Sequence, residues 1–251
     1  MSLERREFET ALGDIWLWGE TEAFSGSKPL VFAILGAFNV EQRWPDHIPQ
    51  RLANVSVVTA QLPGNHCPLP SSHSVEAYAE AFSAVLATMG RPAIVLGASI
   101  GGLAAFAMHG PNLRGIVALD PPLHTAGLWP LVGPFRQMLI DSNHEPRLTE
   151  FLWNVFGVGA DRLEERDYSG LLEGLSVPTV VIVGEEPLQP VRELTMLPGL
   201  VEERDRLAYR RHPLVQLWRV GGVGHNIVNG GFSHVLDAIR WLMIHTGQAR
   251  G

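Results

Sequence analysis

Cysteine is almost absent from this 251-residue chain, whose single example is Cys67. One cysteine excludes a disulfide framework within the chain and favours a reducing compartment. Cys67 follows His66, but no further cysteine and no H-E-x-x-H spacing supports a metal site. The first residues, Met-Ser-Leu-Glu-Arg-Arg-Glu, lack the apolar core of a signal peptide. We therefore expect a cytoplasmic protein without a bound metal.

Positive charge is also scarce. The 19 Lys and Arg residues are outnumbered by 26 Asp and Glu residues, which gives a formal net charge of −7. This balance argues against nucleic acid or an anionic membrane as the main partner. The uncharged stretch 92–111 barely reaches the roughly 20 apolar residues that a membrane helix needs, and clustered glycines would weaken such a helix. We expect no membrane insertion.

Hydrophobic residues, by contrast, make up 46% of the chain, enough for one sizeable core. Apolar, mostly β-branched runs predict strands at 30–35, 55–60, 93–96, 115–119, 179–184 and 214–220. Two shorter strands, at 8–11 and 14–18, predict an edge hairpin. Helical patterns lie between the runs, at 74–89, 103–109, within 199–211, and at 233–246, where Ser233 is the expected cap. This alternation predicts a single α/β domain over 1–251, with a mostly parallel twisted sheet covered by helices on both faces.

The alternation lapses between residues 121 and 175, after the sixth predicted strand. An insertion of this length is more often a helical cap than a loop. Its aromatic residues are expected to form mainly the core of the cap, with some lining a pocket: Trp129, Phe135, Phe151, Trp153 and Phe156.

The sequence Gly97-Ala98-Ser99-Ile100-Gly101-Gly102 joins a predicted strand to a predicted helix. A serine on such a tight turn is held in strained backbone geometry, and the helix amides that follow it point to any oxyanion formed there. The glycine spacing differs from the G-x-G-x-x-G of dinucleotide-binding turns. The alternative to a nucleophile is a purely structural role, in which Ser99 is only a small turn residue.

Nucleophilic chemistry at Ser99 needs a base, a carboxylate that orients the base, and amides for the oxyanion. In open α/β sheets such groups meet at the carboxyl ends of the strands. The candidates there are Asp120, the pair Glu185-Glu186, and His225, in the order serine, acid, histidine.

With these residues in their order, the chain resembles an α/β-hydrolase. The Ser99 turn resembles the nucleophile elbow, and Gly224-His225 resembles the histidine site. Leu35-Gly36-Ala37-Phe38 resembles the His-Gly-Ala-Phe oxyanion loop, and Leu62-Pro63-Gly64 the Asp-Leu-Pro-Gly turn. The resemblance covers nearly the whole chain.

The resemblance implies that Ser99 is the nucleophile and His225 the general base. It implies that the backbone amides of Ile100 and Ala37 form the oxyanion hole. Phe38 is an alternative amide donor or a wall of the substrate pocket, and Trp129 is a second candidate for contact with the substrate.

The acid is the point at which the chain departs from the family pattern. Members usually carry Gly-x-x-Asp followed by proline after the strand at 179–183, whereas this chain has Gly184-Glu185-Glu186-Pro187-Leu188-Gln189-Pro190. Alignment on the second proline makes Glu186 the first candidate. Asp120, at the end of the previous strand, is the second because some relatives draw the acid from there, and Glu185 is the third.

The sequence thus predicts a cofactor-free serine hydrolase, a monomer or homodimer, that cleaves an ester, thioester or similar acyl bond of a small to medium hydrophobic substrate. Two alternatives share the fold: a non-catalytic small-molecule-binding protein, and a hydrolase or lyase acting on carbon–carbon bonds with the same triad. A third is a structural subunit that dimerises through its cap.

Overall fold

The computed structural model describes residues 3–38, 43–62, 70–186 and 197–247. The turn at Pro63-Gly64, the His66-Cys67 pair and the prolines of the acid loop at 187–190 lie outside these residues. Among the described helices, none is long and apolar enough to cross a membrane.

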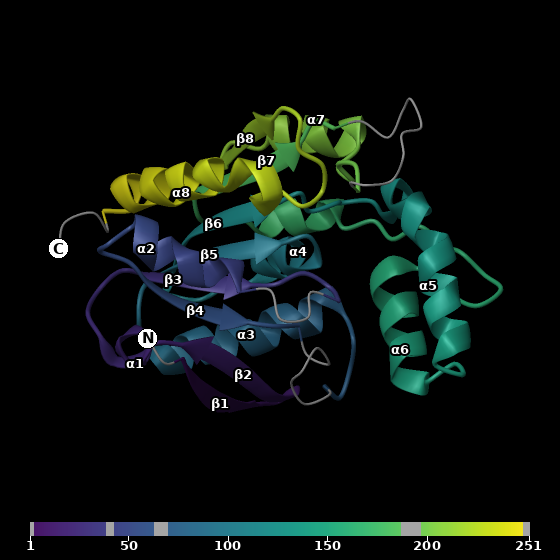
Figure 1. Ribbon diagram of the computed structural model, residues 1–251, viewed down its shortest axis with the longest axis horizontal. Coiled ribbons are helices and arrows are strands. Elements are labelled where there is room, and N and C mark those ends of the chain that lie inside the picture. Colours follow the sequence, from purple (N-terminus) through teal and green to yellow (C-terminus); the bar gives the residue numbers. More distant parts are fainter. Residues whose placement is uncertain (1–2, 39–42, 63–69, 187–196, 248–251) are drawn as a thin grey trace.

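An eight-stranded sheet forms the centre of the molecule, in the order β1-β2-β4-β3-β5-β6-β7-β8 (Figure 1). The antiparallel pairs are β1 with β2 and β2 with β4; the other neighbours are parallel. The predicted edge hairpin and the mostly parallel sheet are therefore confirmed. The strands are β1 Glu4–Thr10, β2 Gly13–Gly19, β3 Leu30–Ile34, β4 Ser56–Ala60, β5 Ala93–Ala98, β6 Leu113–Leu119, β7 Thr179–Gly184 and β8 Val215–Val220.

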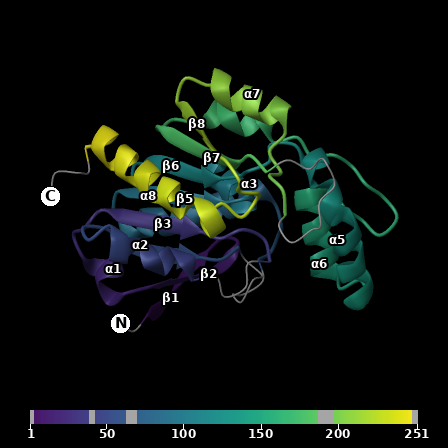
Figure 2. The same ribbon diagram turned by 45° about the horizontal axis from the view of Figure 1, so that its top comes forward.

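Helices cover both faces of the sheet because the central strands are apolar on both sides. Within β3, for example, Phe32 and Ile34 belong to one core cluster, and Val31 and Ala33 to the other. The first cluster packs against α1 Thr21–Ser25, α3 Val75–Met89, α4 Ile100–Ala107 and α7 Glu203–Arg211. The second packs against α2 Ile48–Arg51, which follows the 3₁₀ turn Trp44–His47, and α8 Val228–His245 (Figures 1 and 2).

The segment between β6 and β7 forms a largely helical insertion at one end of the sheet, drawn at the right of Figures 1 and 2. Its helices are α5 Trp129–Asp141 and α6 Pro146–Phe151, with 3₁₀ turns at Thr125–Leu128 and Ser169–Gly174 and a π-helical turn at Leu152–Phe156. Phe135, Leu139 and Leu152 extend the first core cluster into the insertion.

Two helices begin earlier than their sequence patterns predict. α4 starts at Ile100, directly after the turn serine, since no residue interrupts the helix between Ile100 and Leu103. α8 starts at Val228 with Ile227 as its N-cap, so Ser233 lies inside the helix and the predicted cap is wrong. Gly231 has non-helical dihedral angles, which mark a kink near the predicted start.

The close approach of strand and helix at the Ser99 turn depends on two glycines. A Cβ atom on Gly97 would lie 2.3 Å from the carbonyl oxygen of Gly101, and one on Gly101 would lie 2.6 Å from the carbonyl oxygen of Ile34. Real Cβ contacts are not this short, and the atoms met are backbone atoms that cannot rotate away. The small residues around Ser99 therefore have the steric role that the sequence predicts.

Gly101→Ala is expected to destabilise the protein because the new methyl group must displace backbone of β3. Overpacking of this kind costs about 1–3 kcal/mol, or a fall in Tm of roughly 2–12 °C for a domain of this size. Gly133→Ala is the matched control, because nothing lies within 4 Å of its added Cβ and it sits in α5. Calorimetry should find Gly133→Ala as stable as the wild type or more so. A Gly101→Ala variant that keeps the wild-type Tm would contradict the account of this turn.

Candidate active site

Ser99 lies between β5 and α4 with dihedral angles of φ 53° and ψ −121°, a region that residues other than glycine rarely adopt. Three backbone hydrogen bonds hold it there, the longest of them from the N–H of Leu103 to the Ser99 carbonyl at 3.3 Å. Its N–H donates to the carbonyl of Leu119 at 2.8 Å, and its own carbonyl accepts from the N–H of Gly102 at 2.8 Å. Such strain persists only where the surrounding structure holds it, and it is typical of functional sites.

Candidate oxyanion donors come from two elements next to Ser99. Ile100 is the first residue of α4, where helix N–H groups lack intrahelical acceptors and the helix dipole favours negative charge. Ala37 and Phe38 follow β3, which is hydrogen-bonded to β5, and Phe38 also has a positive φ of 57°. Ala37, Phe38 and Ser99 line the same cavity.

His225 and Asp120 form a hydrogen-bonded pair at the carboxyl ends of β8 and β6. The Nδ1 atom of His225 lies 2.8 Å from Oδ2 of Asp120. The backbone N–H of His225 also donates to the carbonyl of Leu197 at 2.9 Å. Asp120 is fully buried, and its carboxylate accepts from the N–H of Leu200 at 2.8 Å and, more weakly, from that of Gly184 at 3.4 Å.

The sequence ranks Glu186 ahead of Asp120 as the acid, but the carboxylate that the structure places against His225 is that of Asp120. Backbone hydrogen bonds fix Glu186 to Val223 and Gly199, at the start of the loop that follows β7, and it is Asp120 that reaches His225. The side chain of Glu185 makes an ion pair with Arg219. The proline spacing of the loop after β7 does not predict this contact, because the contact depends on where the imidazole of His225 lies in the folded chain.

A cavity of about 410 Å³ opens beside Ser99 and His225. Its mostly apolar wall comes from the loop after β3, the ends of β5 and β6, the insertion, and the segment from β8 to α8, together with Trp44, Leu197 and Leu200. The insertion contributes four side chains to this wall: Leu128, Leu131, Phe135 and Phe156. The sequence names Phe135 and Phe156 among the aromatic residues of which some line a pocket, whereas Leu128 and Leu131 belong to no motif.

Trp129 is not brought to this cavity. Its side chain is 58% exposed, and it is absent from the residues that line the space, although its neighbour Leu128 is present. Trp129 opens α5, so a turn of the helix by one position carries its ring away from the side that Leu128 faces. The predicted role of Phe38 as a wall residue agrees with its position in the cavity lining.

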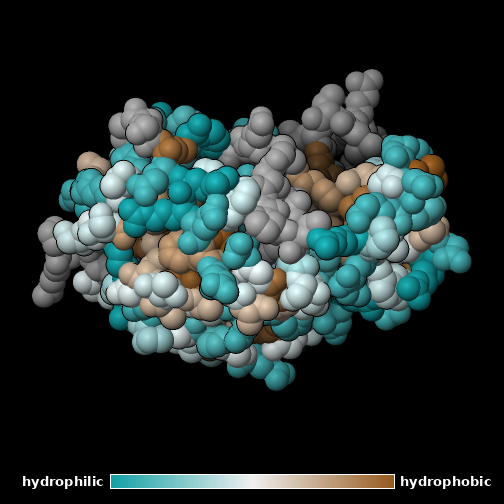
Figure 3. All heavy atoms as spheres, turned by 90° about the horizontal axis from the view of Figure 1, so that it is seen from below, coloured by the Kyte–Doolittle hydropathy of each residue, from teal (hydrophilic) through white to brown (hydrophobic). Residues whose placement is uncertain are grey.

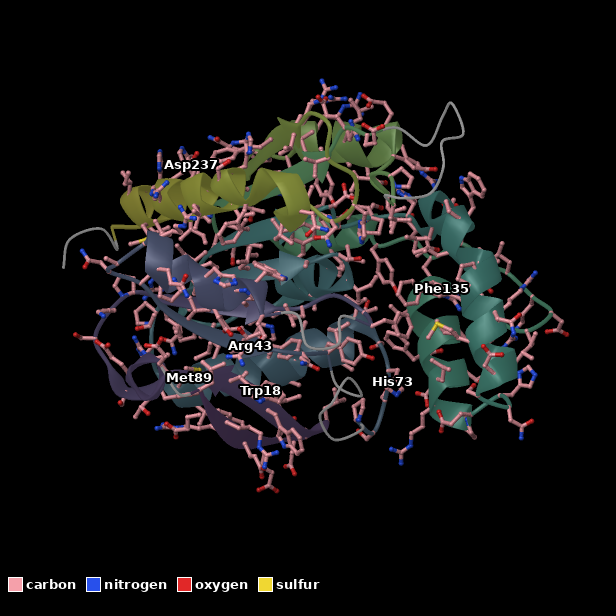
Figure 4. All side chains as sticks on the ribbon, in the orientation of Figure 1. Trp18, Arg43, His73, Met89, Phe135 and Asp237 are labelled. Carbon is pink, nitrogen blue, oxygen red and sulfur yellow. The ribbon has the colours of Figure 1, made fainter. Side chains whose placement is uncertain are left out.

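Phe38 joins the loop after β3 to the insertion through aromatic contacts. Its ring centroid lies 5.6 Å from that of Phe135, 5.5 Å from that of Phe151 and 6.4 Å from that of Phe156. Figure 4 labels Phe135 on α5, facing the body of the molecule. The space-filling view shows hydrophobic atoms where the insertion meets the body and a mainly hydrophilic surface farther out (Figure 3).

His73 makes a second contact between the insertion and the body (Figure 4). Its backbone N–H donates to Oε1 of Glu150 at 3.3 Å, and its ring packs edge-on to Phe151. The ring atom Nδ1 lies 2.7 Å from the hydroxyl of Tyr78. Burial lowers the pKa of His73, because the charged imidazolium loses its hydration there. This residue therefore favours the neutral form at the contact.

Histidine, cysteine and carboxylate side chains do not gather into a metal-binding group of three or more anywhere in the described part of the chain. The cavity itself contains the hydroxyl of Ser99, the imidazole of His225 and two amide side chains, Asn226 and Asn229. These groups suit nucleophilic and acid–base chemistry on an otherwise apolar ligand.

Comparison with known proteins gives one family and many similar folds. The model of the alpha/beta hydrolase family matches residues 32–238. No curated protein matches the sequence.

Several solved structures share the fold at low identity. A thermophilic esterase from Thermogutta terrifontis is 18% identical, with a TM-score of 0.64 over 97% of this chain and 99% of the other. The carboxylesterase CesB from Bacillus subtilis is 16% identical, with a TM-score of 0.66 over 98% and 93%. A thioesterase domain from the curacin biosynthetic pathway is 16% identical, with a TM-score of 0.63 over 96% and 100%. The family model covers most of the chain and the fold agrees with it, so the protein belongs to the alpha/beta hydrolase family.

Proposed function

We propose that this protein is a serine hydrolase that cleaves an ester, thioester or similar acyl bond of a small to medium hydrophobic substrate. The observation that carries the proposal is the Asp120–His225 hydrogen bond beside Ser99, with Ser99 and His225 on the wall of one apolar cavity. Family membership supports hydrolysis in general, and the esterase and thioesterase structures of similar fold are consistent with an acyl substrate.

In this mechanism Asp120 orients His225 and stabilises its charged form. Because Nδ1 faces the carboxylate, Nε2 is the atom left to accept the proton of the Ser99 hydroxyl. The serine oxygen then attacks the acyl carbon, and His225 returns the proton to the departing alcohol or thiol. A water molecule, activated in the same way by His225, hydrolyses the acyl-enzyme and restores Ser99.

Negative charge develops on the carbonyl oxygen during both attacks. We assign its stabilisation to the backbone N–H of Ile100, with Ala37 as the second donor and Phe38 as the alternative. The strained turn at Ser99 places the hydroxyl at the N-terminus of α4, where the helix dipole adds to the effect.

The side chains of the insertion support a hydrophobic substrate. Leu128, Leu131, Phe135 and Phe156 line the same cavity as Ser99 and His225, so an apolar acyl or alcohol group gains burial there. A volume of about 410 Å³ lies at the lower end of the usual range for small-molecule pockets, which is roughly 300–1,000 Å³.

Ser99→Ala and His225→Ala are each expected to abolish hydrolysis of short p-nitrophenyl esters, because they remove the nucleophile and its base. Losses of kcat of about 10⁴-fold or more are typical of triad residues. Initial rates measured spectrophotometrically, with circular dichroism to verify folding, provide the test. A folded wild type without turnover, which still binds small hydrophobic molecules after Ser99→Ala, would favour the non-catalytic binding protein instead.

The acid is tested by comparing Asp120→Asn with Glu186→Gln. Asp120→Asn should lower kcat by about 10³–10⁴-fold, since an amide cannot hold the imidazole in its reactive tautomer as a carboxylate does. Glu186→Gln should stay within about threefold of the wild type. Equal losses in the two variants, or a larger loss in Glu186→Gln, would return the role to the loop after β7.

Phe135→Val should shift the substrate preference of the enzyme towards longer acyl chains, because the smaller side chain enlarges the cavity. The ratio of kcat/KM for octanoyl p-nitrophenyl ester to kcat/KM for the butyryl ester is expected to rise about 10-fold. This is the discrimination that burial of roughly one or two additional methylene groups provides. Ile140→Val on the same helix is the control because that side chain is 60% exposed. An unchanged ratio in Phe135→Val would remove this residue from the substrate wall.

A further inference from the structure

We propose that helix α7 is a clamp on the triad acid, in which Tyr209, Asp205 and Arg206 act as positioning residues for Asp120. This inference rests on the proposed function, because it assigns a role to residues that hold the carboxylate of that same site. Helix α7 lies beside β8 at one edge of the sheet (Figure 2), and none of its residues lines the cavity described above.

Asp120 needs outside support because its own backbone is strained. Its φ angle is 46°, which is unfavourable for a residue with a Cβ atom. The next two residues, Pro121 and Pro122, have no N–H group, so they cannot hold the chain by donating hydrogen bonds. The N–H of Asp120 donates to the carbonyl of Ile182 at 2.8 Å, which holds the chain on the β6 side. Beyond the prolines, the chain can be held by donors to a carbonyl or by an acceptor for the first available N–H, that of Leu123.

Tyr209 supplies the first of these supports. Its hydroxyl donates to the carbonyl of Pro121 at 2.6 Å, which fixes the peptide plane one residue after Asp120. The ring is fully buried and packs against Phe106 at 5.9 Å. Burial raises the pKa of Tyr209 well above its usual value, so the hydroxyl keeps its proton and remains a donor.

Asp205 supplies the second support. Its Oδ2 atom accepts from the N–H of Leu123 at 3.1 Å, and its Oδ1 atom lies 2.5 Å from Nδ1 of His124. The carboxylate is fully buried. Burial raises the pKa of Asp205, and the hydrogen bond and charge of His124 oppose this rise. Asp205 thus binds residues 123 and 124 through both oxygens.

Arg206 acts on the other side of the Asp120 carboxylate. Its guanidinium donates to the carbonyls of Gly184, at 2.9 Å, and of Val201, at 3.1 Å. The two N–H groups that donate to Asp120 belong to Gly184 and Leu200. One side chain therefore joins the ends of both segments that stabilise the buried charge.

These three residues stand at positions i, i+1 and i+4 of one helix. Asp205 and Tyr209 share a face and hold the chain that follows Asp120, while Arg206 holds its hydrogen-bond donors. Displacement of a catalytic group by about 1 Å can cost about 100-fold in rate. Loss of the clamp is therefore expected to lower kcat with little effect on KM, because no residue of α7 lines the cavity.

The test is a double-mutant cycle with Tyr209→Phe and Asp120→Asn, followed by ester hydrolysis. Tyr209→Phe keeps the buried ring and removes only the hydroxyl. We expect it to lower kcat about 10-fold while KM stays within about twofold. In the Asp120→Asn background the same change should alter kcat by less than about twofold, since the clamp acts through the carboxylate that is already absent.

Two control variants separate positioning from general destabilisation. Phe106→Leu disturbs the packing around Tyr209 without removing a hydrogen bond, and Arg210→Ala removes an exposed ion pair with Glu203 on the same helix. Both should leave kcat within about threefold of the wild type, even where Phe106→Leu lowers the Tm as much as Tyr209→Phe does.

A substrate-independent readout is the proton NMR signal of His225 Nδ1–H, assigned by its absence in His225→Ala. In Tyr209→Phe it should move towards its position in Asp120→Asn, and in Phe106→Leu it should stay in place. If the wild type lacks esterase activity but the signal shifts as stated, the proposed function fails and the clamp stands.

Four results would overturn the clamp. One is a wild-type signal and wild-type kcat in Tyr209→Phe; another is a loss in Tyr209→Phe that Phe106→Leu matches at equal Tm. The third is a loss that persists in full in the Asp120→Asn background. Absence of the Nδ1–H signal from the folded wild type would also count against the clamp, because it removes the Asp120–His225 pair on which the clamp acts.

Discussion

A carboxylate without access to water must be paired, and the pairing of Asp120 organises this structure. Asp120 is fully buried and accepts hydrogen bonds from His225, Leu200 and Gly184. Removing one partner of a buried charge pair typically costs about 3–5 kcal/mol. Three segments therefore meet at Asp120: the end of β7, residues 199–201, and the connection between β8 and α8. Because these segments meet at Asp120, the imidazole of His225 is held at the wall of the cavity.

The second constraint is steric, and it acts at the Ser99 turn, between β5 and α4. Ser99 keeps its strained backbone because Gly97 and Gly101 let β3, β5 and α4 approach more closely than a methyl group would allow. The carboxyl ends of β3, β5, β6 and β8 thus bring together amide, hydroxyl, carboxylate and imidazole groups. Parallel strands make this possible, since neighbouring strands end at the same edge.

Much of this arrangement follows from the sequence because it depends on local patterns. Buried parallel strands require continuous apolar runs such as 30–34 and 179–183, and the Ser99 turn requires glycine at fixed spacing. The partner of His225 is different, since hydrogen bonds between segments about 60–105 residues apart determine it. Proline spacing in one loop carries no information about those bonds, so it favours Glu186 although the carboxylate beside His225 is that of Asp120.

Two further features of the structure do not follow from local sequence patterns, for similar reasons. The sequence predicts a helix within 199–211, but nothing in the charge-rich run Glu203–Arg211 indicates that Asp205 and Tyr209 are buried. In the insertion, the sequence makes Trp129 a candidate for contact with the substrate, but the direction of its side chain depends on the exact start of α5. Burial of a polar side chain and the rotation of a short helix are both tertiary effects.

Covalent labelling of the wild-type protein with a fluorophosphonate probe tests the central claim most directly, because only an activated serine reacts with it rapidly. Digestion and mass spectrometry would locate the adduct. Our account predicts one adduct per chain, on the peptide that contains Ser99. A folded protein that remains unlabelled, or that carries the adduct on another residue, would contradict it.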